Sequence, residues 1–268
     1  MRRTVSVRAP LVLYSRSCAG TPGRVLPGQH KNSKKKPMSN FHALVERFHN
    51  FREDYLMKER EFFDALKHGQ DPHTLVIACC DSRVDPAIIL GCRPGEVFVV
   101  RSVAALVPPA DRAFSADAVM AAVEYGVKHL EVQSIVVMGH SNCGGIAGAM
   151  HPEKIAGERY ISGWVQLANP VVEALRREEE LSPESAAGDL LKGDAAHDPA
   201  GFVRRCEEGA VLLSLENLLS YSWLQERVEA GTLGLHALYY DMHAASLNLW
   251  DAEREQFVPS HEKKADEQ

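Results

Sequence analysis

The sequence has no apolar run long enough to cross a lipid bilayer. A transmembrane helix takes about 20 consecutive apolar residues, whereas the runs LVIACC and SIVVMG are each interrupted after a few residues. Apolar residues make up 45% of the chain and charged residues 25%, which is the ordinary range for a globular protein with a sizeable core. We therefore expect a soluble protein with no membrane partner.

Cysteine is also scarce, with six residues in a chain of 268. The six cysteines show no even spacing, and a chain of this length does not need covalent cross-links to fold. Both points favour reduced thiols. The sequence therefore indicates metal binding or catalysis by cysteine rather than a disulfide framework.

Acidic residues are absent from the first 37 positions, which contain nine Lys or Arg. The rest of the chain is acidic, with 21 basic and 36 acidic residues. The acidic remainder of the chain lacks the basic surface that nucleic acid requires. A basic tail alone is weak evidence for a nucleic-acid partner. We expect no nucleic-acid partner.

The basic tail has two interpretations. It is rich in Arg and Ser, as organelle transit peptides are. Alternatively, Met38 is the true start, because helical patterning begins just after it. In both cases we predict a disordered tail over residues 1–37 and a single domain over residues 38–268. The expected location is the cytoplasm, or an organelle if the tail is a transit peptide.

An amphipathic helix is predicted from Asn40, with a second helical stretch reaching Leu66. Apolar residues recur there at spacings of three and four, which places them on one helix face. They are Phe41, Leu44, Val45, Phe48, Phe51 and Tyr55. So many aromatic side chains on a leading helix indicate an arm that packs on a partner subunit, or one that folds back on its own core.

Beyond Pro72, short apolar runs alternate with helical stretches, which is typical of parallel strands buried in an α/β sheet. The predicted strands are His73–Cys79, Val97–Val100, Ser134–Gly139 and Leu233–Tyr240, with an edge strand at Ser246–Trp250. Helices are predicted over Ser115–Leu130, capped by Ser115, and over Val211–Ala230. The predicted fold is α/β, with a mainly parallel central sheet of four parallel strands plus the edge strand, flanked by helices.

Polar clusters follow the first and third predicted strands. One reads Cys79-Cys80-Asp81-Ser82-Arg83 and the other His140-Ser141-Asn142-Cys143-Gly144-Gly145. In open α/β sheets the site lies beyond the carboxyl ends of the strands. Because side chains alternate along a strand, Cys79 and Asp81 point to one side and Cys80 to the other. This pattern indicates Cys79 as a ligand and leaves Cys80 to pack.

The two clusters together predict a metal site. His140 and Cys143 are close enough to bind one ion from a turn, and Cys79 adds a third ligand from the neighbouring strand. Two Cys and one His with a free fourth position is a catalytic zinc arrangement, and thiolates favour zinc over magnesium or calcium. We expect one Zn²⁺ per chain, and Gly144 and Gly145 would let the backbone approach an anionic substrate.

The chain resembles the beta-class carbonic anhydrases, whose signatures are Cys-x-Asp-Ser-Arg and His-x-x-Cys followed by a Gly pair. The similarity runs from about Phe41 to Val258 through PGEVFVVRSVAALVPP, SLENLL and ERVEAGTLGLHALYYD. It implies that zinc is bound by the residues named above, that Asp81 and Arg83 form a dyad beside it, and that the protein is a dimer or tetramer. The chain departs from the usual Arg-Asn-Val-Ala-Asn, because Ser102 and Ala105 replace the asparagines.

The resemblance implies reversible hydration of carbon dioxide to bicarbonate and a proton by zinc-bound hydroxide. Asp81 would orient the hydroxide while Arg83 holds the carboxylate. Two alternatives remain: hydrolysis of carbon disulfide or carbonyl sulfide on the same fold, and a non-catalytic zinc or redox domain. The residue that carries the proton away is not identified, and the candidates are His151, His197 and His243. His236 lies within a predicted apolar strand, so we expect a core histidine there.

Overall fold

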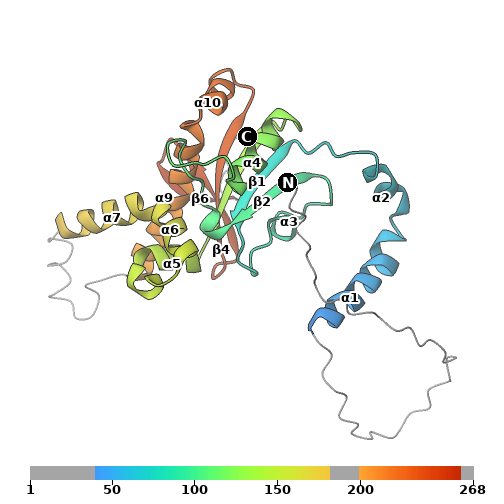
Figure 1. Ribbon diagram of the computed structural model, residues 1–268, viewed down its shortest axis with the longest axis horizontal. Coiled ribbons are helices and arrows are strands. Elements are labelled where there is room, and N and C mark those ends of the chain that lie inside the picture. Colours follow the sequence, from blue (N-terminus) through green and yellow to red (C-terminus); the bar gives the residue numbers. More distant parts are fainter. Residues whose placement is uncertain (1–39, 182–198, 261–268) are drawn as a thin grey trace, which may run out of the picture. The chain divides into compact units, whose positions relative to one another are not determined.

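The computed structural model describes residues 40–181 and 199–260 (Figure 1). These residues divide into two compact units, one ending at Glu59 and one beginning at Arg60. The predicted boundary between residues 37 and 38 lies outside the described residues.

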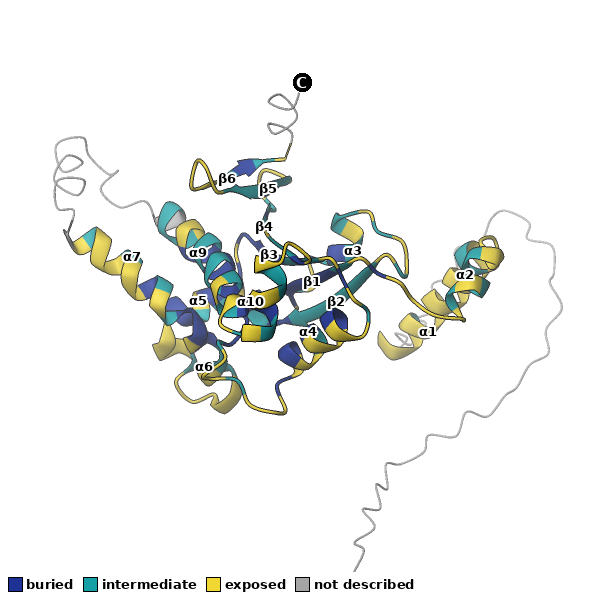
Figure 2. Cartoon of the chain, turned by 90° about the horizontal axis from the view of Figure 1, so that it is seen from above, coloured by how far each residue is buried: buried dark blue, intermediate teal, exposed yellow. Residues whose placement is uncertain are grey.

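The first unit contains the predicted amphipathic helix. It consists of helix α1 (Asn40–Phe51) and a π-helical turn, η1 (Arg52–Leu56). No residue of α1 is buried, and Figure 2 shows the helix exposed along its length. Phe41 is 68% exposed, Leu44 60% and Phe48 55%, so the apolar stripe is open to solvent.

The second unit is built on one six-stranded sheet (Figure 1). The strands are β1 (Thr74–Cys79), β2 (Val97–Ser102), β3 (Ser134–His140), β4 (Gly234–Asp241), β5 (Ser246–Asp251) and β6 (Gln256–Pro259). Their order is β2-β1-β3-β4-β5-β6. The first four are parallel, whereas β5 and β6 are antiparallel to their neighbours.

The sheet confirms the predicted mainly parallel α/β fold. The four buried runs form the four parallel strands, and the segment beginning at Ser246 forms β5. It is not the edge strand, because β6 pairs with it on the far side. The sequence did not indicate β6, since Gln256–Pro259 is too short to show an alternating pattern and ends in proline.

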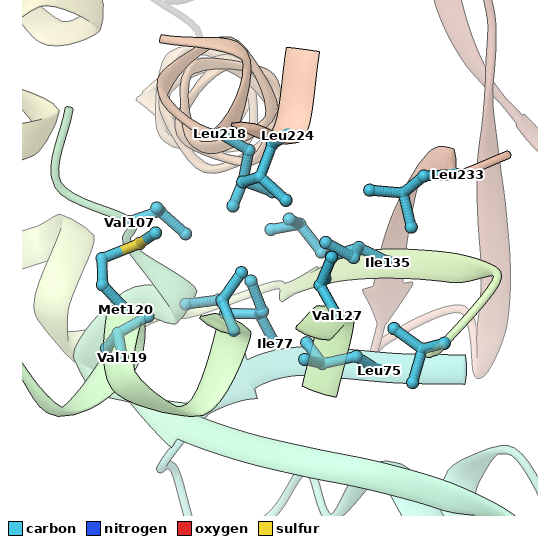
Figure 3. Packing of buried hydrophobic residues seen from close by; sticks show 14 of the residues in the cluster. Leu75, Ile77, Val107, Val119, Met120, Val127, Ile135, Leu218, Leu224 and Leu233 are labelled. Carbon is cyan, nitrogen blue, oxygen red and sulfur yellow. The ribbon is translucent and has the colours of Figure 1, made fainter. Parts of the chain in front are cut away.

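The two faces of the sheet carry alternate residues of β1. Leu75 and Ile77 belong to a core that also contains side chains of β3 and of the helices on that face (Figure 3). Val76 and Ala78 lie on the other face, with Met138. All four β1 residues are fully buried, which explains why the strand is apolar on both sides.

The helices of this unit differ from the predicted ones in two places. They are α2 (Arg60–Leu66), α3 (Pro86–Ile89), α4 (Ala118–Lys128), α5 (Gly144–Met150), α6 (Arg159–Val165), α7 (Asn169–Leu181), α9 (Pro199–Leu219) and α10 (Ser222–Glu229), with short 3₁₀ turns η2 (Val103–Ala105), η3 (Pro152–Ile155) and η4 (Gln166–Ala168). The cap of α4 is Asp117 rather than Ser115, because its carboxylate accepts from the Met120 amide at 2.9 Å. The predicted helix Val211–Ala230 is two helices, which break at Ser220 and Tyr221.

His236 is exposed on β4, so the prediction of a core histidine was wrong. None of the helices in the described ranges, 40–181 and 199–260, is both long and apolar enough to cross a membrane.

Candidate metal centre

The predicted metal ligands lie at the carboxyl ends of adjacent parallel strands. Cys79 is the last residue of β1, and His140 is the last residue of β3. β1 and β3 pair in parallel, so both strands end at the same edge of the sheet. Cys143 follows at the start of α5, after a turn in which Asn142 has the left-handed backbone (φ 56°) that asparagine tolerates. This turn returns the chain toward Cys79.

The three ligand atoms converge on one point. The sulfurs of Cys79 and Cys143 are 4.0 Å apart, and all three ligand atoms lie within 4.8 Å of one another. Cys79 is 4% exposed, Cys143 4% and His140 2%. Among the described residues, these three form a buried group that could hold a metal ion.

A hydrogen bond at one ring nitrogen orients the imidazole of His140, and the other ring nitrogen has no hydrogen-bond partner among the described residues. Its Nδ1 lies 2.9 Å from the carbonyl oxygen of Ser141, to which it donates. Its Nε2 is buried and has no hydrogen-bond partner within the described part of the chain. Buried polar atoms are nearly always paired, and metal-binding histidines usually donate their other N–H to an acceptor in this way. The Nε2 atom therefore fits a metal ligand.

The surroundings of Cys79 favour its thiolate. The nearby Cys143 thiol lowers the pKa of Cys79 by sharing a proton with its sulfur. Backbone amides of Asp81 and Ala104 also donate to this sulfur, at 3.4 and 3.3 Å. Because the thiolate is the form that binds metal, these contacts prepare Cys79 for coordination.

Asp81 is held by Arg83, the residue with which the family resemblance pairs it. Arg83 donates from Nε to one carboxylate oxygen of Asp81 at 3.0 Å and from Nη2 to the other at 2.7 Å. Its Nη2 also donates to the Asn142 carbonyl at 3.0 Å, which joins the dyad to the metal-binding turn. The guanidinium holds the pKa of the Asp81 carboxyl well below its usual range. Asp81 is thus an ionised acceptor beside the metal group.

Arg101 was missed by the sequence analysis and fixes the loop that follows β1. It donates to the Cys79 carbonyl at 2.9 Å and to the Asp81 carbonyl at 2.6 Å. It also pairs with the Asp85 carboxylate at 3.1 Å, and Asp85 caps α3. One side chain on β2 therefore sets the backbone of both Cys79 and Asp81.

These donors fit zinc. Two thiol sulfurs and one unpartnered imidazole nitrogen are soft and borderline ligands that suit Zn²⁺. Asp81 is engaged by Arg83 and lies outside the metal group, so three protein ligands would leave a fourth coordination position. That number matches a catalytic zinc site rather than a closed structural one.

Comparison with known proteins decides the family. The family model described as "Carbonic anhydrase" matches residues 74–247, which span both ligand clusters. A carbonic anhydrase from Helicobacter pylori is 32% identical over 215 residues, covering 79% of this chain and 91% of its own. The chain belongs to the beta-class carbonic anhydrases. It is also 35% identical to beta carbonic anhydrase 6, mitochondrial, and to beta carbonic anhydrase 5, chloroplastic, both from Arabidopsis thaliana, and spans 66% and 64% of their lengths.

Solved beta-carbonic anhydrase structures share the fold. The structure of CcaA superposes with a TM-score of 0.69 at 29% identity, covering 82% of this chain and 91% of that one. A tetrameric enzyme from Sordaria macrospora gives a TM-score of 0.65 at 29% identity, covering 78% and 95%. The mainly parallel sheet and its flanking helices are therefore those of the family.

The chain departs from the usual beta-carbonic anhydrase pattern at Ser102, the last residue of β2, and at Ala105 in η2. Ala104 and Ala105 both have left-handed backbones, with φ of 61° and 55°, a conformation that costs an alanine about 1–2 kcal/mol. This backbone aims the Ala104 amide at the Cys79 sulfur. Ser102, the other departure, donates from its hydroxyl to the Leu106 carbonyl at 3.2 Å. Neither substitution removes a metal ligand.

The glycine pair has a packing role at its second position. A Cβ on Gly145 would lie 2.6 Å from Val103 and 2.9 Å from the Ala104 Cβ, so α5 approaches η2 only because this residue is glycine. A Cβ on Gly144 would meet nothing within 4 Å. Substrate contact by the two glycines stays a prediction.

Within residues 40–181 and 199–260, three further cysteines lie outside the metal group. Cys80 was predicted to pack, but it is exposed, because the chain leaves the sheet directly after Cys79. Cys206 is buried and Cys92 half-buried, and neither belongs to the group that could hold a metal. The alternation of side chains therefore separated Cys79 from Cys80 correctly, although it gave the wrong surroundings for Cys80.

The structure separates the three candidate histidines for proton transfer. His243 lies beside the site, because its Nε2 is 2.6 Å from Nδ2 of Asn142. His151 pairs with Glu153 at 3.3 Å instead. His197 lies outside the described residues.

Proposed function

We propose that this protein catalyses the reversible hydration of carbon dioxide to bicarbonate and a proton, with one zinc ion held by Cys79, His140 and Cys143. The observation that carries the proposal is the unpartnered Nε2 of His140, buried between two thiols and next to an Asp81 carboxylate that Arg83 restrains. Zinc with three protein ligands keeps a fourth position for water and lowers the pKa of that water toward neutrality.

Asp81 would orient the reacting water. Its carboxylate is ionised and 18% exposed, so it can accept a hydrogen bond from a water at the open coordination position. The paired contact with Arg83 holds this carboxylate away from the metal. Without that contact, Asp81 could become a fourth ligand and block the site.

Apolar side chains around the site would favour carbon dioxide, which is small and uncharged. Cys79 and Cys143 belong to a buried cluster together with Val84, Leu106 and Ile146, which are each at most 2% exposed. Carbon dioxide has no hydrogen-bond donor, so it needs apolar surroundings beside the metal more than it needs polar partners. This cluster makes the surroundings of the two sulfurs apolar.

Carbon disulfide and carbonyl sulfide are the alternative substrates, and a zinc or redox domain without turnover is the other alternative. The zinc-loaded protein should be mixed in turn with carbon dioxide, carbon disulfide and carbonyl sulfide, and proton release followed with a pH indicator. We expect rapid proton release with carbon dioxide alone. Faster release with either sulfur compound would replace the proposed substrate, and no release with any of them would favour the non-catalytic domain.

We also propose that the protein forms a homodimer or homotetramer in which α1 packs on another copy. Its apolar stripe is exposed, and one structure that the chain resembles is described as tetrameric. Replacing Phe41, Leu44 and Phe48 with serine should lower the molar mass measured by light scattering. The matched control replaces Glu46, Arg47 and Asn50 on the same helix and should leave the mass unchanged. A wild-type mass in the apolar triple variant would contradict the packing of this arm on a partner.

His243 is proposed to carry the proton away. Each hydration releases one proton. The exposed imidazole of His243 can take it up at Nε2 when the Asn142 amide presents its oxygen in place of Nδ2, and can then pass it to buffer. In dilute buffer, His243→Ala should lower kcat about a hundredfold while kcat/KM stays unchanged, and added imidazole should restore kcat. His151→Ala is the control and should behave as wild type. An unchanged kcat in dilute buffer would remove His243 from proton transfer.

The remaining partners and the location stay predictions. We expect no nucleic-acid or membrane partner. The cytoplasm is the expected compartment, with an organelle as the alternative, and two of the relatives carry mitochondrial and chloroplastic names.

A further inference from the structure

A buried carboxylate lies directly behind the metal-binding turn. Glu207 of α9 is 3% exposed. One of its oxygens accepts from the Cys143 amide at 2.9 Å, and the other accepts from the Tyr239 hydroxyl at 2.7 Å. Tyr239 is 1% exposed, so the contact is closed to solvent on that side. Burying a carboxylate is costly unless its oxygens are paired, and both are paired here.

The fold leaves Glu207 little freedom to move. Helix α9 lies directly on β3, because a Cβ on Gly139 would be 2.4 Å from the Val211 side chain and 3.8 Å from the Glu207 carbonyl. Tyr239 is the register partner of Gly139 on β4. The carboxylate is therefore fixed from the helix and from the strand next to β3.

The contact between Glu207 and the Cys143 amide fixes the one candidate ligand that is not part of a strand. Cys79 and His140 are strand residues, whereas Cys143 lies between the left-handed Asn142 and the first turn of α5. Its amide would be free at such a position, since the first amides of a helix have no partner within the helix. By holding this amide, Glu207 sets the direction from which the Cys143 sulfur approaches the metal.

We infer that Glu207 is a positioning residue that holds Cys143 in its zinc-binding geometry. The inference rests on the zinc site of the proposed function. Burial raises the pKa of Glu207, but an acceptor for the Cys143 amide is present in either protonation state. Position therefore matters more than charge. Contacts behind a metal ligand typically change metal affinity about 10- to 100-fold when removed.

The test compares three substitutions of Glu207. Gln keeps an acceptor at the same reach, Asp keeps the charge but shortens the reach by one methylene, and Met fills the space without an acceptor. Zinc affinity is measured by competition with a chelator, and ligand geometry by the absorption bands of the Co²⁺-substituted protein. Glu216→Gln, an exposed position on the same helix, is the control.

We expect Gln to stay within about threefold of wild type and Met to weaken zinc binding about 10- to 100-fold with altered Co²⁺ bands. Asp should lie between them. A Met variant with wild-type affinity and spectrum would overturn the inference. If the Met variant does not fold, the Gln and Asp pair decides, because wild-type affinity in Asp with a loss in Gln would show that charge acts rather than position. These readouts do not depend on turnover, so they remain valid even if carbon dioxide is not the substrate.

Discussion

Cys143→Ser is expected to lose zinc and to lower carbon dioxide hydration to the background rate. Serine has a hydroxyl that stays protonated at neutral pH, so a thiolate ligand is replaced by a weak neutral one. Losing one of three protein ligands should cost about 4 kcal/mol of binding free energy, or a factor of about a thousand in zinc affinity. The measurement is zinc per chain after dialysis, together with the initial hydration rate.

Cys92→Ser is the matched control, because Cys92 is half-buried and lies outside the metal group. It should keep one zinc per chain and full activity. One tightly bound zinc in the Cys143→Ser protein would show that the ligand set assigned here is wrong.

Asp81→Asn is expected to keep its zinc and to lose turnover by about a hundredfold or more. Asparagine has one accepting oxygen and one NH₂ group in its side chain, whereas Asp81 has two accepting oxygens. The variant therefore loses one of the two contacts with Arg83, and only one of its side-chain atoms can still accept a hydrogen bond from the reacting water. The zinc content and kcat should be measured on the same preparation.

Asp64→Asn provides the control for this substitution, because Asp64 is a surface residue of α2 that pairs with Lys67. It should leave kcat unchanged. If Asp81→Asn turns over at the wild-type rate with zinc bound, Asp81 has no part in the reaction.

The convergence of Cys79, His140 and Cys143 could be predicted from the sequence, because two local rules apply to these residues. Parallel strands end at one edge of the sheet, and the side chains of consecutive residues alternate in direction, which together placed Cys79 and Asp81 beside His140. The short spacing from His140 to Cys143 requires only one turn of chain. Each of these facts can be read from a few neighbouring residues.

Glu207 could not be found in this way, because it lies 64 residues from the Cys143 amide that it holds. It stands in the charged run Arg204-Arg205-Cys206-Glu207-Glu208, which is typical of a solvated helix face. The buried positions around it, Cys206, Ala210 and Val211, mark the inner face of α9 and were the available signal. Glu207 reaches the Cys143 amide because α9 packs closely on Gly139. This contact is one of tertiary structure.

The other differences have similar causes. Ser115 and Asp117 are both good helix caps, and only the backbone shows that Asp117 makes the contact. His236 follows the alternating pattern of β4, but the residue itself is exposed. Sequence periodicity gives the element in each case, whereas its end or its exposed face is set by neighbours distant in the sequence.

The most direct test of the zinc-dependent hydration proposed here is a stopped-flow assay of carbon dioxide on protein beginning at Met38. The rate should be measured with zinc bound, after chelation, and after one equivalent of zinc is returned. We expect fast turnover that rises from neutral to mildly alkaline pH, disappears on chelation and returns with zinc. A zinc-loaded protein with one metal per chain and no turnover across that range would contradict the proposed function.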